Sequence, residues 1–434
     1  MEWRESNVMS WNNHYAPELI EKIKMVEEKI KPVHDHIHEI ALFNQNKVLQ
    51  SFRNKKVTEQ HFNPTTGYGY DDFGRDALEE VYAEVFGAEA GLVRPQIISG
   101  THAISTALFG VMRPGDDLLY ISGAPYDTLL EIVGVTGNGI GSFKEYQMGF
   151  NQVDLLPDGK VDFETVKEKM TSKIKMVAIQ RSRGYASRPS FTISQIEEMI
   201  QFVKSIDPEV IVFVDNCYGE FVEETEPIEV GADLMAGSLI KNPGGGLAKT
   251  GGYIVGKTEL IEACGYRLTT PGIGREAGAS LYSLQEMYQG FFMAPHTVGE
   301  AVKGAVYTAA LLEACGIEST PKWDDKRTDL IQMISLNDKD KMVQFAQTIQ
   351  KYSPINAHVS PIGAYMPGYE DDVIMAAGTF IQGSSMELTA DGPIRPPYTL
   401  YVQGGLTYEH VKLAVSSAVE ELFFNNSTKK YYCN

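Results

Sequence analysis

Short, nearly continuous apolar runs alternate with helical stretches from about Leu92 to Gly256, and this alternation constrains the fold more than any other feature. The runs are VRPQIIS, DLLYIS, KIKMVAIQ, EVIVFVD, DLMAGSLI and GGYIVG. Strands that are apolar throughout need cover on both faces, which is typical of a mostly parallel sheet between layers of helices. The sequence therefore predicts an α/β fold built on such a central sheet.

The segments on either side of this region have a different pattern. Near the N-terminus, apolar residues recur at spacings of three and four, which predicts a helix with one buried stripe and a kink at Pro32. Beyond about residue 290, the helical stretch AVKGAVYTAALLEAC leads into mixed segments and a final apolar helical face. We predict three parts: an N-terminal helical arm (1–75), a large α/β domain (76–290) and a smaller C-terminal α+β domain (291–434).

Length and charge exclude several classes of function. The 434 residues can form two or three domains, and the net charge of -19 disfavours nucleic acid or an anionic membrane as a partner. No apolar run approaches the roughly 18 residues that a membrane span needs, and the N-terminal residues lack the apolar stretch of a signal peptide. The four cysteines have no CxxC spacing, which fits a reducing compartment. We therefore expect a cytoplasmic protein.

A single lysine, Lys241, ends an apolar run and is followed by a flexible stretch in GSLIKNPGGGLAKTGG. Three other features precede it, each at the end of an apolar run. The first is ISGTHAIST, where Gly100 and a helix start offer free N–H groups to a phosphate. The second is Tyr126 in GAPYDTL, whose ring can cover a flat ligand. The third is Asp215 in EVIVFVDNCYGEF, which points into the crevice where α/β sheets bind ligands.

This ordered set matches the needs of pyridoxal phosphate. The acid keeps the pyridine nitrogen protonated, and the lysine holds the aldehyde as a Schiff base and later moves a proton. Taken singly, each feature has a simpler interpretation: a helix start, a packed tyrosine, a helix cap and a solvated turn lysine. The order of the four together favours the cofactor.

Two other kinds of site are weighed and rejected. PGGGLAKT resembles a nucleotide-binding P-loop, but that motif needs glycine before its lysine and here Ala248 precedes Lys249. His34 and His38 are four residues apart on the predicted helix, but two imidazoles without a third ligand do not make a dedicated metal site. No metal is predicted.

With these residues in place, the sequence resembles the fold-type-I pyridoxal-phosphate enzymes, which share the aspartate aminotransferase fold. Within them it is similar to the Cys/Met-metabolism group, and particularly to the methionine gamma-lyase family or aluminium-resistance branch, described as cystathionine beta-lyase-like. GSLIKNPGGGLAKTGGYIVG and IRPPYTLYVQGGLTYEHVK are characteristic of that branch. The resemblance covers residues from about Tyr68 to Leu406.

The resemblance implies roles for individual residues. Lys241 forms the Schiff base, Tyr126 stacks on the ring and Asp215 pairs with its nitrogen, and these three are the expected catalytic residues. The phosphate site is expected at the start of the helix and at the strand end before Lys241, with contacts from Ser99, Gly100, Thr101, His102 and Ser238.

The sequence departs from the family pattern at three places. Tyr68 matches a tyrosine that reaches the neighbouring subunit's phosphate, but Tyr70 stands where an arginine is expected. Ser238-Leu239-Ile240 replaces the Ser-x-Thr that precedes the lysine in relatives. No arginine stands at the usual spacing before VQGG to bind the substrate carboxylate. Arg395 in DGPIRPPY is the replacement candidate because a guanidinium suits a carboxylate, and Arg183 in RSRGYASRPS is either a second candidate or a solvated charge.

The expected function is that of a carbon–sulfur lyase which eliminates a thiol from cystathionine, methionine or a related thioether amino acid. The family implies a homo-oligomer, a dimer or tetramer, in which the N-terminal arm contributes to the interface and two chains share each active site. Two alternatives stay open: an aminotransferase or other elimination enzyme with the same cofactor, and a non-catalytic member of the fold with a role in metal stress.

Overall fold

A computed structural model describes residues 11–366 and 371–424 and contains two sheets. The larger has seven strands in the order β1-β7-β6-β5-β4-β2-β3, in which β2 to β6 run parallel and β7 is antiparallel to both of its neighbours. The strands are β1 (Ala90–Arg94), β2 (Asp117–Tyr120), β3 (Gly149–Gln152), β4 (Ile174–Gln180), β5 (Ile211–Asp215), β6 (Leu234–Ser238) and β7 (Gly252–Gly256). The predicted mostly parallel sheet is confirmed.

Both faces of this sheet are buried, as the apolar runs require. In β5, Phe213 belongs to an apolar cluster on one face, whereas Val212 and Val214 belong to another on the opposite face. Helices α3 (Gly100–Val111), α4 (Asp127–Ile132) and α7 (Thr258–Leu268) supply the first cluster, and α5 (Phe163–Lys169) and α6 (Ile193–Ile206) supply the second. The run VRPQIIS is a strand only in its first two residues, because Pro95 has no N–H to donate.

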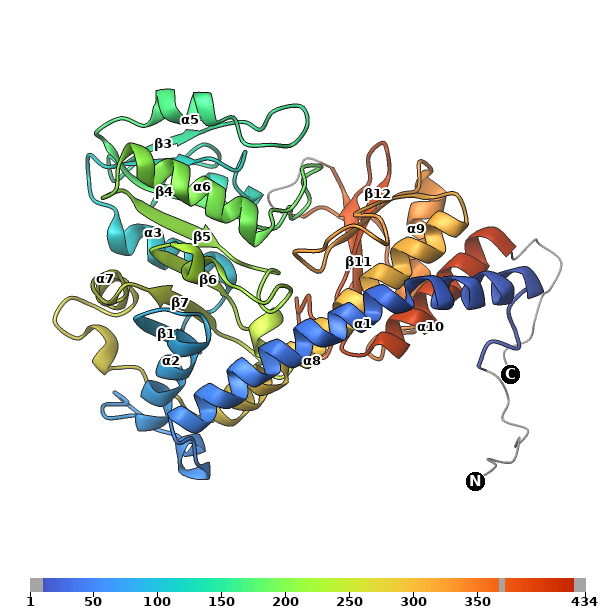
Figure 1. The fold of residues 1–434 in the computed structure, drawn as a ribbon, viewed down its shortest axis with the longest axis horizontal. Coiled ribbons are helices and arrows are strands. Elements are labelled where there is room, and N and C mark those ends of the chain that lie inside the picture. Colours follow the sequence, from blue (N-terminus) through green and yellow to red (C-terminus); the bar gives the residue numbers. More distant parts are fainter. Residues whose placement is uncertain (1–10, 367–370, 425–434) are drawn as a thin grey trace.

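Two long helices run alongside each other and connect the two parts of the molecule (Figure 1). They are α1 (Pro17–Asn54) and α8 (Leu284–Ala314). The predicted stripe of α1 is buried at Ile23, Val26, Ile30 and Ile37. Pro32 lies inside α1 without ending it, so the helix continues where the sequence suggested an interruption. α2 (Phe73–Val85) packs between α1 and β1.

The second sheet has five antiparallel strands in the order β10-β11-β12-β9-β8. They are β8 (Glu318–Thr320), β9 (Gln332–Ser335), β10 (Val373–Ala376), β11 (Thr389–Pro393) and β12 (Thr399–Gln403). Helices α8 and α9 (Lys339–Lys351) contact the strands, and α10 (Tyr408–Val419) packs on these two helices. The predicted α+β C-terminal part is confirmed, while the boundaries of the three parts stay predictions. The described part of the chain also contains five short helices: η1 (Glu59–Phe62), η2 (Pro227–Val230), η3 (Asn242–Gly244), η4 (Gly274–Glu276) and η5 (Glu420–Phe424). Among the described helices, none has the length and apolar character needed to cross a membrane.

Candidate active site

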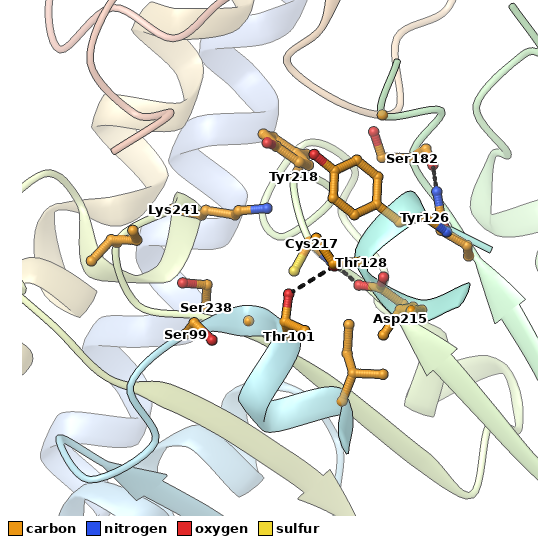
Figure 2. Close-up of a pocket in the computed structure, with 16 residues that line it drawn as sticks. Ser99, Thr101, Tyr126, Thr128, Ser182, Asp215, Cys217, Tyr218, Ser238 and Lys241 are labelled. Carbon is orange, nitrogen blue, oxygen red and sulfur yellow. Dashed lines mark hydrogen bonds between the residues drawn. The ribbon is translucent and has the colours of Figure 1, made fainter. Parts of the chain in front are cut away.

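A pocket of about 200 Å³ lies at the carboxyl ends of β4, β5 and β6, beside the N-terminus of α3 (Figure 2). This is the edge of a parallel sheet where α/β folds bind ligands. Seven residues predicted for the site line it together: Ser99, Gly100, Thr101, Tyr126, Asp215, Ser238 and Lys241. They come from four separate segments of the chain, so only the fold could bring them to one cavity.

Lys241 directly precedes η3, and its side chain lines the pocket. Its Nζ lies 3.8 Å from the centre of the Tyr218 ring. Burial opposes the charge of the amine, but Cys217, Tyr218 and Asp215 favour it, and the net effect raises the pKa of Lys241.

One of the glycines after Lys241 is explained by a close contact within the chain, which the sequence did not reveal. A side chain at Gly245 would meet the Gly290 carbonyl oxygen of α8 at 2.2 Å, and Gly245 has a positive φ of 55°. At this position, the observed close approach is to a helix of the same chain.

Asp215 is the last residue of β5 and lies across the pocket from Lys241 (Figure 2). Its Oδ1 accepts a hydrogen bond from the Cys217 N–H at 3.1 Å. Burial raises the pKa of Asp215, while the charge of Lys241 and the Cys217 N–H lower it, and the net direction is upward. A buried acid opposite a buried amine suits a ligand that carries a protonated ring nitrogen at one end and an aldehyde at the other.

The start of α3 forms a cradle for an anion. Ser99 caps this helix by accepting the His102 N–H at 3.0 Å, while the N–H groups of the first turn have no partner within the helix. A side chain at Gly100 would lie 3.2 Å from both Cys217 Sγ and Ser238 Cβ, so glycine keeps this approach open. The buried Ser238 Oγ has no hydrogen-bond partner among the described residues. These features fit the phosphate of pyridoxal phosphate.

Tyr126 is held beside the pocket through a residue that the sequence did not single out. Gln180, the last residue of β4, accepts the Tyr126 N–H at 2.8 Å and donates to the Ser182 carbonyl at 2.8 Å. Gln180 is a polar residue at the end of an apolar run, which is the same signal that identified Asp215. Other pocket residues that sequence reasoning missed or set aside are Cys217, Tyr218, Thr128, Ser182 and Gly184.

Three of the residues predicted to bind the cofactor do not line the pocket. They lie on the protein surface or at the edge of the pocket. His102 is in the first turn of α3, where its Nδ1 accepts the Ile98 N–H at 3.2 Å. Tyr68 and Tyr70 are exposed and stack on each other with ring centres 5.4 Å apart. Their expected contact is with a neighbouring subunit, so it stays a prediction.

The two candidate arginines are in different environments, and neither lines the pocket. Arg395 is exposed and pairs with Asp371 at 3.2 Å. Burial raises the pKa of Asp127, the residue after Tyr126, and the charge of Arg395 opposes this rise. Arg183 is buried, with its guanidinium 3.8 Å from Met333 Sδ, and its two neighbours in sequence line the pocket. Their contact with a substrate carboxylate stays a prediction.

A second and larger cavity, of about 740 Å³, lies beside α1 and the start of α6. It contains none of the residues predicted for catalysis or cofactor binding. The smaller pocket is therefore the candidate active site, because the acid, the amine and the anion cradle all lie in it.

Comparison with known proteins identifies the family to which the chain belongs. The family described as methionine gamma-lyase matches residues 19–423. The chain belongs to the methionine gamma-lyase family. This is a pyridoxal-phosphate-dependent family of carbon–sulfur lyases, so the predicted family and its cofactor are confirmed at family level.

Individual relatives agree with this assignment. The chain is 68% identical over 407 residues to the uncharacterized protein YnbB of Bacillus subtilis, which covers 93% of this chain and 97% of YnbB. It is also 68% identical to a Listeria monocytogenes protein provisionally named a cystathionine beta-lyase involved in aluminium resistance, with a TM-score of 0.92 and coverage of 92% and 99%. A carbon–sulfur lyase involved in aluminium resistance from Clostridium novyi is 45% identical, with a TM-score of 0.92 and coverage of 97% and 100%.

More distant structures confirm the fold. Pyridoxal-phosphate enzymes that are 14% to 16% identical to this member of the methionine gamma-lyase family superpose on it with TM-scores between 0.53 and 0.60. At this identity the likeness concerns the fold alone. The predicted fold-type-I architecture is therefore confirmed.

Proposed function

We propose that this member of the methionine gamma-lyase family is a carbon–sulfur lyase that eliminates a thiol from a thioether amino acid of the cystathionine or methionine type. The observation that carries the proposal is the single pocket shared by Asp215, Lys241 and the N-terminus of α3. An acid, an amine and an anion cradle are the protein groups that this chemistry requires.

Pyridoxal phosphate, when bound, supplies an aldehyde that captures amines and a ring that accepts electrons. The residues around it have distinct tasks. The first turn of α3 and Ser238 bind the phosphate, and Tyr126 covers the ring. Asp215 holds a proton on the ring nitrogen. With cofactor and substrate bound, the Lys241 Nζ would take the proton from the substrate Cα.

The departing sulfur needs a proton, and Tyr126 or Lys241 is the proposed donor. Elimination at the beta carbon needs no further proton transfer, whereas elimination at the gamma carbon requires a second proton removal at the beta carbon.

A panel of thioether amino acids tests the proposal. Purified protein saturated with pyridoxal phosphate is expected to release a thiol, ammonia and a 2-oxo acid in equal amounts. Pyruvate from cystathionine indicates beta elimination, and 2-oxobutyrate from methionine indicates gamma elimination. Cofactor binding without release of either product from any member of the panel would contradict the proposed activity.

The same panel separates the alternative functions. An aminotransferase would need an added 2-oxo acid and would release no thiol. A non-catalytic member of the fold would keep the colour of the bound cofactor without turnover. The lyase is favoured over both because the family and the C. novyi relative carry that activity in their names.

We also infer that the protein works as a homo-oligomer in which a second copy completes each site. Tyr68, Tyr70, Leu281 and Tyr282 are large, exposed hydrophobic residues, and backbone hydrogen bonds connect their two segments. Exposed apolar surface of this kind marks a protein–protein interface. Light scattering on the purified protein is expected to give the mass of a dimer or tetramer, whereas the 48.1 kDa mass of one chain would contradict the inference.

A further inference from the structure

The five-stranded sheet has one apolar face and one polar face, and the polar face contacts the segment that lines the pocket. In β11 and β12, Asp391 lies opposite Tyr401, and Tyr401 lies opposite Met333 of β9. Side chains on opposed residues share a face, so these three point the same way. Their neighbours Ala390, Leu400, Val402 and Ile334 point the other way, into the core.

Asp391 on this polar face is a buried carboxyl group, only 2% exposed. Among the described residues it has no ion-pair partner, and its Oδ1 accepts a hydrogen bond from Gln403 at 3.4 Å. Burial raises the pKa of Asp391 to about 7. A carboxyl group without a cation is costly to bury, so its hydrogen bonds must hold it there.

The other oxygen of Asp391 accepts the hydroxyl of Tyr185. Tyr185 is also held at its backbone, because the Tyr401 hydroxyl donates to the Tyr185 carbonyl at 2.7 Å, and the two rings are 5.1 Å apart. The small sheet therefore fixes both the ring and the backbone of a residue whose neighbours Ser182 and Gly184 line the pocket.

The same segment packs on Tyr126. A side chain at Gly184 would lie 3.0 Å from the Tyr126 ring, and the rings of Tyr126 and Tyr185 are 6.3 Å apart. The backbone of Tyr126 is tied to this segment as well, through Gln180 and Ser182. A contiguous set of contacts thus leads from Asp391 through Tyr185 to the residue proposed to cover the cofactor ring.

We propose that Asp391 is a positioning residue. It acts through Tyr185 to hold Tyr126 in place against the cofactor ring, and in this way it couples the five-stranded sheet to the active site. The proposal rests on the role of Tyr126 in the function proposed above. Asp391 does not itself line the pocket, so it acts through Tyr185 and not by direct contact.

The test compares Tyr185→Phe and Asp391→Leu in protein saturated with pyridoxal phosphate. Both variants are expected to lower kcat by about 10-fold to 100-fold, the range reported for small misplacements of a catalytic group, with a smaller change in KM. The visible circular dichroism of the bound cofactor is expected to weaken in both, because this signal depends on how the ring is held. The double variant is expected to be no worse than the more affected single one.

Two further variants separate positioning from a general loss of structure. Asp391→Asn keeps an acceptor for Tyr185 and is expected to restore most of the dichroism. Thr389→Val removes a buried hydroxyl from the same polar face without breaking a hydrogen bond of the described residues, and is expected to match the wild type.

Wild-type dichroism in Tyr185→Phe and Asp391→Leu would overturn the proposal, as would an equal loss in Thr389→Val. The dichroism needs no turnover, so it stays informative if the proposed elimination is not observed. Failure of the lyase proposal and failure of the positioning proposal are therefore distinct results.

Discussion

Lys241→Ala is expected to remove the visible absorption band of lysine-bound pyridoxal phosphate and to lower turnover by roughly 10³-fold or more, the scale on which removal of a covalent catalytic group acts. The amine is buried, faces the Tyr218 ring at 3.8 Å and shares the pocket with Asp215. No other lysine lines this pocket among the described residues. The loss should therefore not be made up by a neighbour.

The matched control is Lys249→Ala in the same glycine-rich segment. Lys249 is exposed and pairs with Glu286 outside the pocket, so its removal is expected to leave both the band and turnover unchanged. Borohydride reduction of the wild type followed by peptide mass spectrometry is expected to find the cofactor attached at Lys241. Attachment elsewhere, or a visible band that survives in Lys241→Ala, would contradict the assignment.

Asp215→Asn is expected to retain pyridoxal phosphate but to lower kcat by about 10-fold to 100-fold, the effect of losing one charge-assisted contact at about 1.4 kcal/mol per factor of ten. Asparagine keeps the volume and can still accept the Cys217 N–H, so the fold should persist. It removes the negative charge that holds a proton on the ring nitrogen, and that charge-assisted contact is worth about 1.5–3 kcal/mol. Steady-state kinetics on the best substrate of the panel measure the effect.

Asp207→Asn serves as the control for this prediction. Asp207 precedes the opposite end of β5 from the pocket, and its side chain accepts the Glu209 N–H at 2.9 Å. Turnover within about twofold of the wild type is expected, as for most surface substitutions. If Asp215→Asn were equally active, the carboxylate would have no part in the chemistry and the mechanism proposed above would fail.

The apolar runs were sufficient to predict the architecture because burial on both faces leaves little choice of layer arrangement. Val212, Phe213 and Val214 alternate between two cores, and only a sheet covered on both sides can satisfy them. The ends of those runs were equally informative. A charged residue there lies at the carboxyl end of its strand, where α/β sheets bind ligands, so Asp215 and Lys241 could be predicted from the pattern. Ser238 was predicted from the family resemblance.

Residues whose role depends on distant contacts could not be found in this way. Tyr218 lies three residues after Asp215 in the sequence, yet nothing there indicates that its ring faces the Lys241 amine. Pro32 lacks an N–H for the helix, yet α1 continues past it as one helix that packs along α8. Gly245, after Lys241, allows a close contact with α8 at Gly290, which is distant in the sequence.

The sequence by itself determined the layered fold, the family and the identity of the acid, the amine and the phosphate cradle, because each depends on local pattern and on the ends of buried runs. Only the tertiary structure decided that Asp391 of the small sheet holds Tyr185, that Gln180 secures Tyr126 and that Arg395 lies outside the pocket. Those contacts join residues that are distant in the sequence, and their geometry follows from how the separate elements pack in the fold.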